Sequence, residues 1–133
     1  NIFNGFFNGY YIGFIMESGS IYNYNVLIGI LIFVLGMFIN ISSDNTLISL
    51  RKNSEGYKIP HGNFFNFVSC PNYMGEIIEW IGFSIIAFSL PALSFTLWTF
   101  FNLVPRALNH HDWYLENFDN YPKNRKAVIP FVL

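Results

Sequence analysis

Three polar side chains interrupt an apolar stretch of this chain, and they constrain its fold more than any other feature. The stretch Val68-Ser-Cys-Pro-Asn-Tyr-Met-Gly-Glu-Ile-Ile-Glu-Trp80 carries Asn72, Glu76 and Glu79. At about 100° per residue, these side chains fall within roughly 60° of one another on a helix. Pro71 suits the first turn of a helix, where its missing N–H would have no partner anyway. The sequence therefore predicts a helix that begins at Pro71 and carries one polar stripe into apolar surroundings.

The composition indicates that these surroundings are a membrane. The chain is 53% hydrophobic and only 11% charged, whereas a soluble domain has about 25% charged residues. A carboxylate near the centre of a bilayer costs at least ~2.5 kcal/mol unless it faces a cavity or a partner. Two carboxylates on one helical face therefore predict a wet, functional pocket. The net charge of −1 gives no indication of a nucleic-acid partner, and the single Cys70 excludes an intrachain disulfide and a cysteine-based zinc site.

The predicted fold class is all-α, a polytopic transmembrane helical bundle. We expect helices near 2–16, 24–50, 72–89 and 91–117, with a break at Leu90–Pro91. Residues 74–101 form either one kinked helix or a hairpin of two shorter ones. The hairpin is favoured because it places the basic clusters on the same side of the membrane. The chain starts inside an apolar run without Met, so we interpret residues 1–133 as one C-terminal membrane domain that lacks N-terminal helices.

Three glycines near the start of the chain have a spacing that would allow close helix packing. Gly5, Gly9 and Gly13 follow small-xxx-small spacing, which lets helix backbones approach each other in lipid. The more ordinary interpretation of these residues, as simple packing glycines, is preferred.

A second polar stripe lies near the end of the helix predicted over 24–50. Asn40, Asp44 and Arg51 fall within roughly 40° of one another if that helix continues. The pattern alone does not separate a binding stripe from a solvated helix end. Further along, Arg106 and His110 share a face, with Tyr114 next to it. Adjacent His110 and His111 do not face one site on a helix, so no metal site is predicted and His111 is assigned a structural role.

Pooled together, these side chains form a candidate site for a nucleotide-type ligand. Carboxylates and amides suit ribose hydroxyls and a carboxamide, arginines suit phosphates, and Tyr and His can place protons. No G-x-G-x-x-G, P-loop or H-E-x-x-H motif is present. We expect Glu76 to face the ligand and Glu79, one turn deeper, to bind a neighbouring helix. The candidate cofactor-binding residues are Asn40, Asp44, Arg51, Asn72, Glu76, Arg106, His110 and Tyr114.

Motifs along the whole chain resemble the C-terminal domain of the steroid 5α-reductase family, the 3-oxo-5α-steroid 4-dehydrogenases. The sequences of these motifs are most similar to those of the plant-type members of the family. The trans-2-enoyl-CoA reductases share Ser-Cys-Pro-Asn-Tyr and the Tyr-Pro…Ile-Pro-Phe tail but lack Gly-Glu-Ile-Ile-Glu-Trp. The motifs that carry the resemblance are Asn40-Ile-x-Ser43-Asp44, Tyr57-Lys-Ile-Pro-x-Gly62, Val68-Ser-Cys-Pro-Asn-Tyr73, Gly75-Glu-Ile-Ile-Glu-Trp-Ile-Gly82, Pro105-Arg-Ala107, His111-x-Trp-Tyr114 and Tyr121-Pro-Lys-x-Arg-Lys-Ala-Val-Ile-Pro-Phe131.

The resemblance implies a seven-helix, multi-pass enzyme of the endoplasmic reticulum membrane. Such an enzyme uses NADPH to reduce the 4,5 double bond of a 3-oxo-Δ4-steroid, with hydride added at C5 and a proton at C4. Tyr114 and Glu76 become the catalytic candidates, and positions matching Arg106, His110 and Arg125 are sensitive in the family. The residues that hold the steroid carbonyl belong to the family's N-terminal half, which leaves the activity of this chain alone open.

Two positions depart from the family pattern. Lys58 stands where many members have Arg, which weakens a planar contact with phosphate, and Asn63 replaces a usual Gly. The implied partners are the lipid bilayer and the steroid substrate. The alternatives are a trans-2-enoyl-CoA reductase of fatty-acid elongation and a non-catalytic, truncated membrane fragment.

Overall fold

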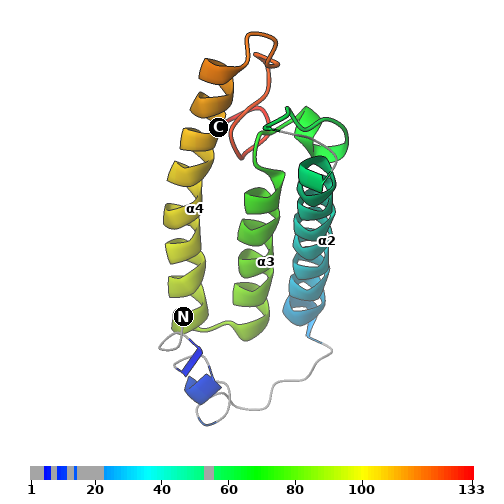
Figure 1. Ribbon diagram of the computed structural model, residues 1–133. Helices are drawn as coiled ribbons and strands as arrows, with labels where there is room; N and C mark the ends of the chain where they lie inside the picture. Colours follow the sequence, from blue (N-terminus) through cyan, green and yellow to red (C-terminus); the bar gives the residue numbers. More distant parts are fainter. Residues whose placement is uncertain (1–4, 7–8, 12–13, 15–22, 53–55) are drawn as a thin grey trace.

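Three long helices stand side by side in the computed structural model, which describes residues 5–6, 9–11, 14, 23–52 and 56–133. They are α2 (Tyr24–Lys52), α3 (Pro71–Ala87) and α4 (Leu90–Asn117), with a short 3-10 helix η2 (Asn63–Asn66) before α3. In Figure 1, α3 lies between α2 and α4, and the chain after α4 folds back over one end of the row. The described residues contain no strand, only an isolated bridge between Val68 and Lys126. The all-α prediction is confirmed for this part, whereas the helix predicted over 2–16 falls mostly outside the described residues.

The hairpin between α3 and α4 is confirmed, and its break comes one or two residues before the predicted position. Pro71 is the first residue of α3, and the helix ends at Ala87, followed by the C-cap Phe88, whose backbone is left-handed at φ 41°. Ser89 then caps α4, because its hydroxyl accepts a hydrogen bond of 3.3 Å from the backbone N–H of Ala92. Pro91 occupies the first turn of α4, where no N–H is needed.

Backbone-to-backbone contact joins α2 to α3 through four glycines. A Cβ atom added at Gly36 would lie 2.5 Å from the Glu79 nitrogen, and one added at Gly75 would lie 2.5 Å from the Asn40 nitrogen. Gly29 and Gly82 make the same kind of contact two turns away. By contrast, Gly5 and Gly9 have no atom within 4 Å of an added Cβ, and Gly13 lies outside the described residues. Within the described residues, the close helix packing therefore involves the glycines of α2 and α3 and not Gly5 or Gly9.

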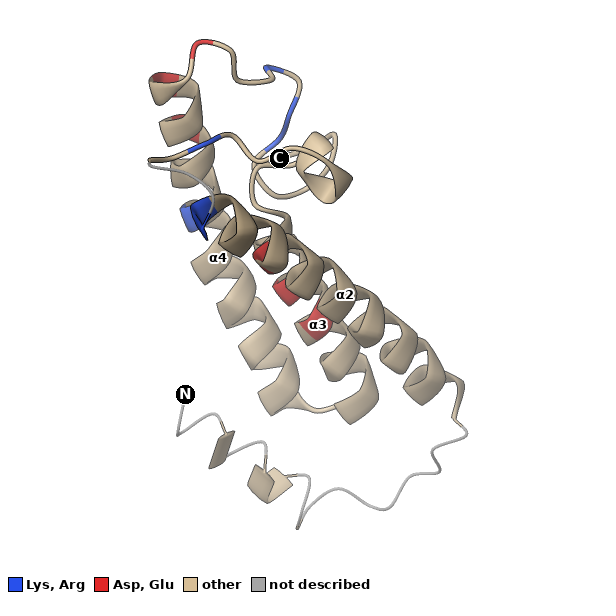
Figure 2. Ribbon diagram, turned by 45° about the vertical axis from the view of Figure 1, so that its right-hand side comes forward, with Lys and Arg blue, Asp and Glu red and all other residues tan. Residues whose placement is uncertain are grey.

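Charged residues are absent from one end of the three helices. No Lys, Arg, Asp or Glu occurs in residues 24–43 or 80–105, and the ends of α3 and α4 that the turn joins are entirely tan in Figure 2, without blue or red. By length and composition, α2 is the one helix within the described residues that could cross a membrane, a test that core helices and signal sequences also pass. Its exposed residues include Leu31 and Phe38. The fold thus has an apolar end and a charged end.

The segment after α4 packs against the residues that lead into α3. Backbone hydrogen bonds of 2.7 Å and 3.0 Å run from Ser69 N to Lys126 O and from Cys70 N to Ala127 O. Val68 and Val128 are completely buried beside them. The tail therefore returns to the helices and is fixed at the charged end.

The glycine contact gives a testable prediction for stability. Replacing Gly36 or Gly75 by Ala would press a methyl group into backbone atoms that cannot move aside, so each change should cost about 1–3 kcal/mol. Gly9→Ala is the matched control, because an added Cβ meets open space there. Thermal unfolding of the detergent-solubilised protein measures the effect. Equal midpoints for Gly36→Ala, Gly75→Ala and Gly9→Ala would show that the helices do not touch through these glycines.

Candidate functional site

A cavity of about 450 Å³ opens at the charged end of the fold, between the last turns of α2, the loop that follows it and the end of α4. It brings together Arg51 and Tyr114, two of the predicted site residues. Tyr57 and Lys58, from the loop, complete its polar lining and were not among the predicted site residues. Two cationic side chains and two phenol rings suit an anionic ligand that also carries a flat ring. The residues that line the cavity are Leu47, Leu50, Arg51, Gly56, Tyr57, Lys58 and Tyr114.

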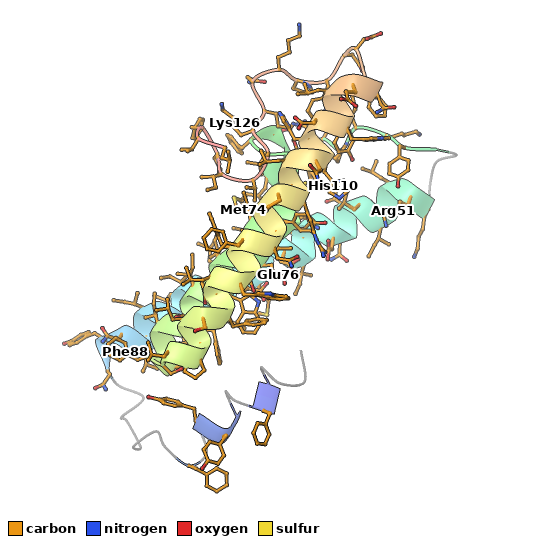
Figure 3. All side chains as sticks on the ribbon, turned by 90° about the vertical axis from the view of Figure 1, so that its left-hand side faces the viewer. Arg51, Met74, Glu76, Phe88, His110 and Lys126 are labelled. Atoms are coloured by element: carbon orange, nitrogen blue, oxygen red, sulfur yellow. The ribbon has the colours of Figure 1, made fainter. Side chains whose placement is uncertain are left out.

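A second group of predicted residues lies nearer the middle of the helices. Asp44 of α2 and Arg106 of α4 both lie close enough to Glu76 of α3 to act on its carboxylate electrostatically. The ring of Tyr73 lies 6.1 Å from that of His110 on the same side. In Figure 3, His110 and Arg51 lie toward the charged end, and Glu76 lies deeper between the helices. The predicted stripes therefore converge from three helices, although Arg51 and Tyr114 line the cavity and Glu76 lies below it.

Asn40 and Glu79 bind each other rather than pointing toward the cavity. The Asn40 side-chain nitrogen donates a 3.1 Å hydrogen bond to Glu79 Oε1, and both residues are partly buried. The prediction that Glu79 is a helix–helix partner is confirmed. The role of Asn40 as a cofactor ligand stays a prediction, because this hydrogen bond already engages its amide. Asn72 is half-buried at the start of α3.

Glu79 and Glu76, the two carboxylates of α3, should therefore have different roles, the first in stability and the second in ligand binding. Glu79→Leu removes the acceptor for the Asn40 amide and should cost about 1–3 kcal/mol of stability, because a buried donor loses its partner. Glu76→Gln should leave stability almost unchanged and weaken ligand binding instead. Urea unfolding and ligand titration of both variants separate these effects. An equally stable Glu79→Leu variant, or a strongly destabilised Glu76→Gln variant, would contradict the assignment.

A hydrogen-bond network at the charged end links three segments that are far apart in sequence. Ser69 Oγ lies 2.6 Å from His111 Nδ1 and 2.6 Å from the Tyr121 hydroxyl. Arg125 donates to the Tyr121 hydroxyl at 3.3 Å and to the carbonyl of Pro60 at 3.2 Å. The structural role predicted for His111 is confirmed, whereas Ser69 and Tyr121 were not recognised as site residues. Ser69 is only 3% exposed, so this Ser–His pair has no access to a substrate and is not a nucleophile.

Tyr114 is placed directly against this network. Its ring is parallel to that of Tyr121, with centroids 5.1 Å apart and planes inclined by 9°. Tyr114 lies beyond the uncharged part of α4, and burial, followed by the neighbouring Tyr121, raises the pKa of its phenol. The phenol is therefore protonated at neutral pH. It can donate a hydrogen bond or a proton to a ligand in the cavity.

The His111 imidazole favours its neutral form in this network. Burial lowers its pKa, the carboxylate of Asp112 partly opposes that effect, and Arg125 and Lys126 add to it. The imidazole has a pKa of about 6.5 in the unfolded chain and a lower pKa in the folded protein. The group therefore favours the folded state at pH values above about 6.5, where both states hold it neutral. This contribution is lost as the pH falls below that value and the unfolded state binds the extra proton.

Cys70 should be unreactive in the folded protein. Burial raises the pKa of its thiol from 9.0 to about 12, so only about one molecule in ten thousand carries a thiolate at pH 8. Alkylation by a maleimide at pH 8 should be slow in the native protein and fast after unfolding in detergent and urea. Equal rates in both states would show that the segment before α3 is not buried under the tail.

A second cavity lies at the opposite, apolar end and has a volume of about 560 Å³. Its lining includes Ser84, Phe88, Ser89 and Leu93. Leu90 and Tyr114 are separated by about 36 Å along α4, at 1.5 Å per residue. The two cavities are therefore distinct sites. Within the described residues, no three His, Cys, Asp or Glu side chains are grouped as a metal site would require.

The helical fold, with an apolar end and one helix that could cross a membrane, indicates the class of membrane-associated proteins, and its charged end carries a cavity lined by two cations and two tyrosines. Comparison with known proteins identifies its family. The family model for 3-oxo-5-alpha-steroid 4-dehydrogenase matches residues 1–133. The chain belongs to this family of steroid reductases.

Curated relatives from plants and mammals support the assignment. The chain is 45% identical to steroid 5-alpha-reductase DET2 of Arabidopsis thaliana, over 99% of the chain and 52% of that protein. It is 46% identical to 3-oxo-5-alpha-steroid 4-dehydrogenase 2 of Homo sapiens, over 97% of the chain and 52% of that protein. The chain therefore spans about half the length of the curated relatives it matches. The family resemblance found in the sequence motifs is confirmed.

Proposed function

We propose that the protein containing this chain reduces the 4,5 double bond of a 3-oxo-Δ4-steroid and uses NADPH as the reductant. The observation that carries the proposal is the meeting of Arg51, Lys58 and Tyr114 around one cavity in a chain of the steroid reductase family. The names of the relatives supply the reaction class. The chemistry of the cavity supports the choice of cofactor.

The residues of the cavity fit a phosphorylated dinucleotide. Arg51 and Lys58 provide two cations at the exposed side of the cavity, where phosphates would remain partly in water. An arginine side chain forms a planar, always charged fork that matches phosphate oxygens, and Lys58 adds a point charge. Tyr57 and Tyr114 offer ring faces to a base or a nicotinamide. When bound, NADPH supplies the hydride that adds to C5 of the steroid.

The chain's own residues would bind the cofactor and supply protons. The buried Tyr114 phenol is protonated at neutral pH and can donate toward a carbonyl or a carboxamide. Glu76 is half-buried on α3, with the exposed side chains of Asp44 and Arg106 within electrostatic range, and these groups can bind hydroxyl and amide groups. Groups that hold the steroid carbonyl would come from the part of the relatives that this chain does not cover.

The proposed location is a multi-pass arrangement in the membrane of the endoplasmic reticulum. The uncharged residues 24–43 of α2 extend about 30 Å, the thickness of a bilayer's hydrocarbon core. The cationic end, with Arg51, Lys52 and Lys58, would face the cytoplasm, as the distribution of basic residues in membrane proteins favours. A sterol would then arrive from lipid while the nucleotide enters from water.

Nucleotide titration tests the assignment of the cavity. Arg51→Ala should weaken NADPH binding about ten- to a hundredfold, which corresponds to about 1.5–3 kcal/mol for a charge-assisted contact. Lys52→Ala is the matched control, because Lys52 is an adjacent, exposed cation that does not line the cavity. Arg106→Ala probes the group of charges around Glu76. Equal affinity of the wild type for NADPH and NADH would reject the preference for NADPH, and equal loss in Arg51→Ala and Lys52→Ala would reject the phosphate assignment of Arg51.

The reaction itself is tested by NADPH consumption in the full-length protein. A 3-oxo-Δ4-steroid and a trans-2-enoyl-CoA of matched concentration serve as competing substrates. Reduction of the steroid alone supports the proposal, and reduction of the enoyl-CoA alone replaces it with the fatty-acid reaction. The absence of both reactions in a protein that still binds NADPH would favour a non-catalytic relic of the family.

A further inference from the structure

We propose that Tyr121 is a positioning residue, which holds the ring of Tyr114 in place in the cavity and is itself anchored by Ser69. This inference rests on the proposed function, because it assigns Tyr114 to the cofactor cavity. It adds a role for the segment after α4, which contributes no residue to the cavity lining. The experiment below separates the failure of this inference from the failure of the proposed function.

The contacts of Tyr114 show why it needs a partner from another segment. Three rings lie against it: Trp113 at 5.4 Å, Phe118 at 5.9 Å and Tyr121 at 5.1 Å between centroids. Trp113 belongs to α4 and Phe118 is its C-cap, so both move with the helix that carries Tyr114. Tyr121 lies beyond the end of α4. Its ring is the one of the three that is parallel to Tyr114, at 9°.

Tyr121 can restrain Tyr114 because its own position is fixed on several sides. Its hydroxyl contacts Ser69 Oγ at 2.6 Å, and the Arg125 guanidinium carbon lies 4.9 Å from its ring centroid. The edge of the His111 ring completes the enclosure, with centroids 5.9 Å apart. Tyr121 is only 3% exposed. It can therefore act on a ligand only through Tyr114.

Ser69 connects this restraint to the rest of the fold. Its hydroxyl also lies 3.1 Å from the Lys126 carbonyl, and its backbone N–H donates to the same carbonyl at 2.7 Å. Ser69 immediately precedes Cys70, the N-cap of α3. The ring of Tyr114 is thus fixed relative to the start of α3 as well as to α4. Movement of the tail would release the phenol from its place in the cavity.

The test compares Tyr121→Leu, which removes the parallel ring, with Tyr121→Phe, which keeps it. In the full-length protein, Tyr121→Leu should weaken NADPH binding about three- to tenfold, the range expected for one aromatic pair, and Tyr121→Phe should recover most of that loss. Tyr24→Leu is the control, because Tyr24 is 82% exposed at the other end of the fold. In a Tyr114→Leu background, Tyr121→Leu should cause no further loss.

The environment of the Tyr114 ring can also be measured without NADPH, so the inference can be tested even if the cofactor does not bind. With 3-fluorotyrosine at position 114, ¹⁹F NMR should show one sharp resonance in the wild type and in Tyr24→Leu, and a broadened or split resonance in Tyr121→Leu and Ser69→Ala. An unchanged resonance in Tyr121→Leu, or the same loss of NADPH affinity with and without Tyr114, would overturn the positioning role. A wild type that shows the sharp resonance but does not bind NADPH would instead overturn the proposed function.

Discussion

The direct contact between the backbones of α2 and α3 is the interaction on which the rest of the structure depends. The carbonyl of Gly75 would lie 2.7 Å from a Cβ at Gly36, and the carbonyl of Gly36 would lie 2.7 Å from a Cβ at Gly75. Only helices without side chains at these points can approach so closely, and such approach replaces the hydrophobic effect as the source of attraction in lipid. Dispersion forces act over the whole contact, since each atom pair adds a little.

This contact also determines where the polar groups lie. It aligns Asn40 with Glu79, so one buried carboxylate has a hydrogen-bond donor, and it leaves Glu76 one turn nearer the charged end. Because α2 continues for several turns beyond the contact, Arg51 reaches the loop and the end of α4. The tail then closes this end through Ser69, Tyr121 and Arg125. The cavity is therefore assembled from segments that the glycine contact and the tail hold in register.

Much of the helical architecture could be predicted because its determinants are local. Proline in a first turn and the switch from apolar to polar residues predicted α2, α3 and α4 to within about two residues. The glycine contact was also visible in principle, since Gly29 and Gly36, like Gly75 and Gly82, are seven residues apart and share a helical face. Asn63 is explained only by the structure: at φ 46° it occupies a left-handed conformation, which Gly or Asn tolerates best.

The site was less predictable because it depends on contacts between distant segments. Helical periodicity places Asn40 and Arg51 on one face of a helix. In the fold, however, Asn40 donates a hydrogen bond to Glu79, whereas Arg51 lines the cavity. The stack of Tyr114 on Tyr121 and the hydrogen bond between Tyr121 and Ser69 join residues whose proximity no spacing rule encodes. The loop residues Tyr57 and Lys58 were likewise placed in the cavity by the tertiary fold alone.

Hydrogen exchange of the full-length protein, with and without NADPH, tests the central claim most directly. If the charged end forms the nucleotide site, NADPH should slow exchange in the peptides that cover residues 47–58 and 110–126. Exchange near the α3–α4 turn, where the second cavity lies, should not change. Slower hydrogen exchange only near the α3–α4 turn, or unchanged exchange at the charged end at saturating NADPH, would contradict the account.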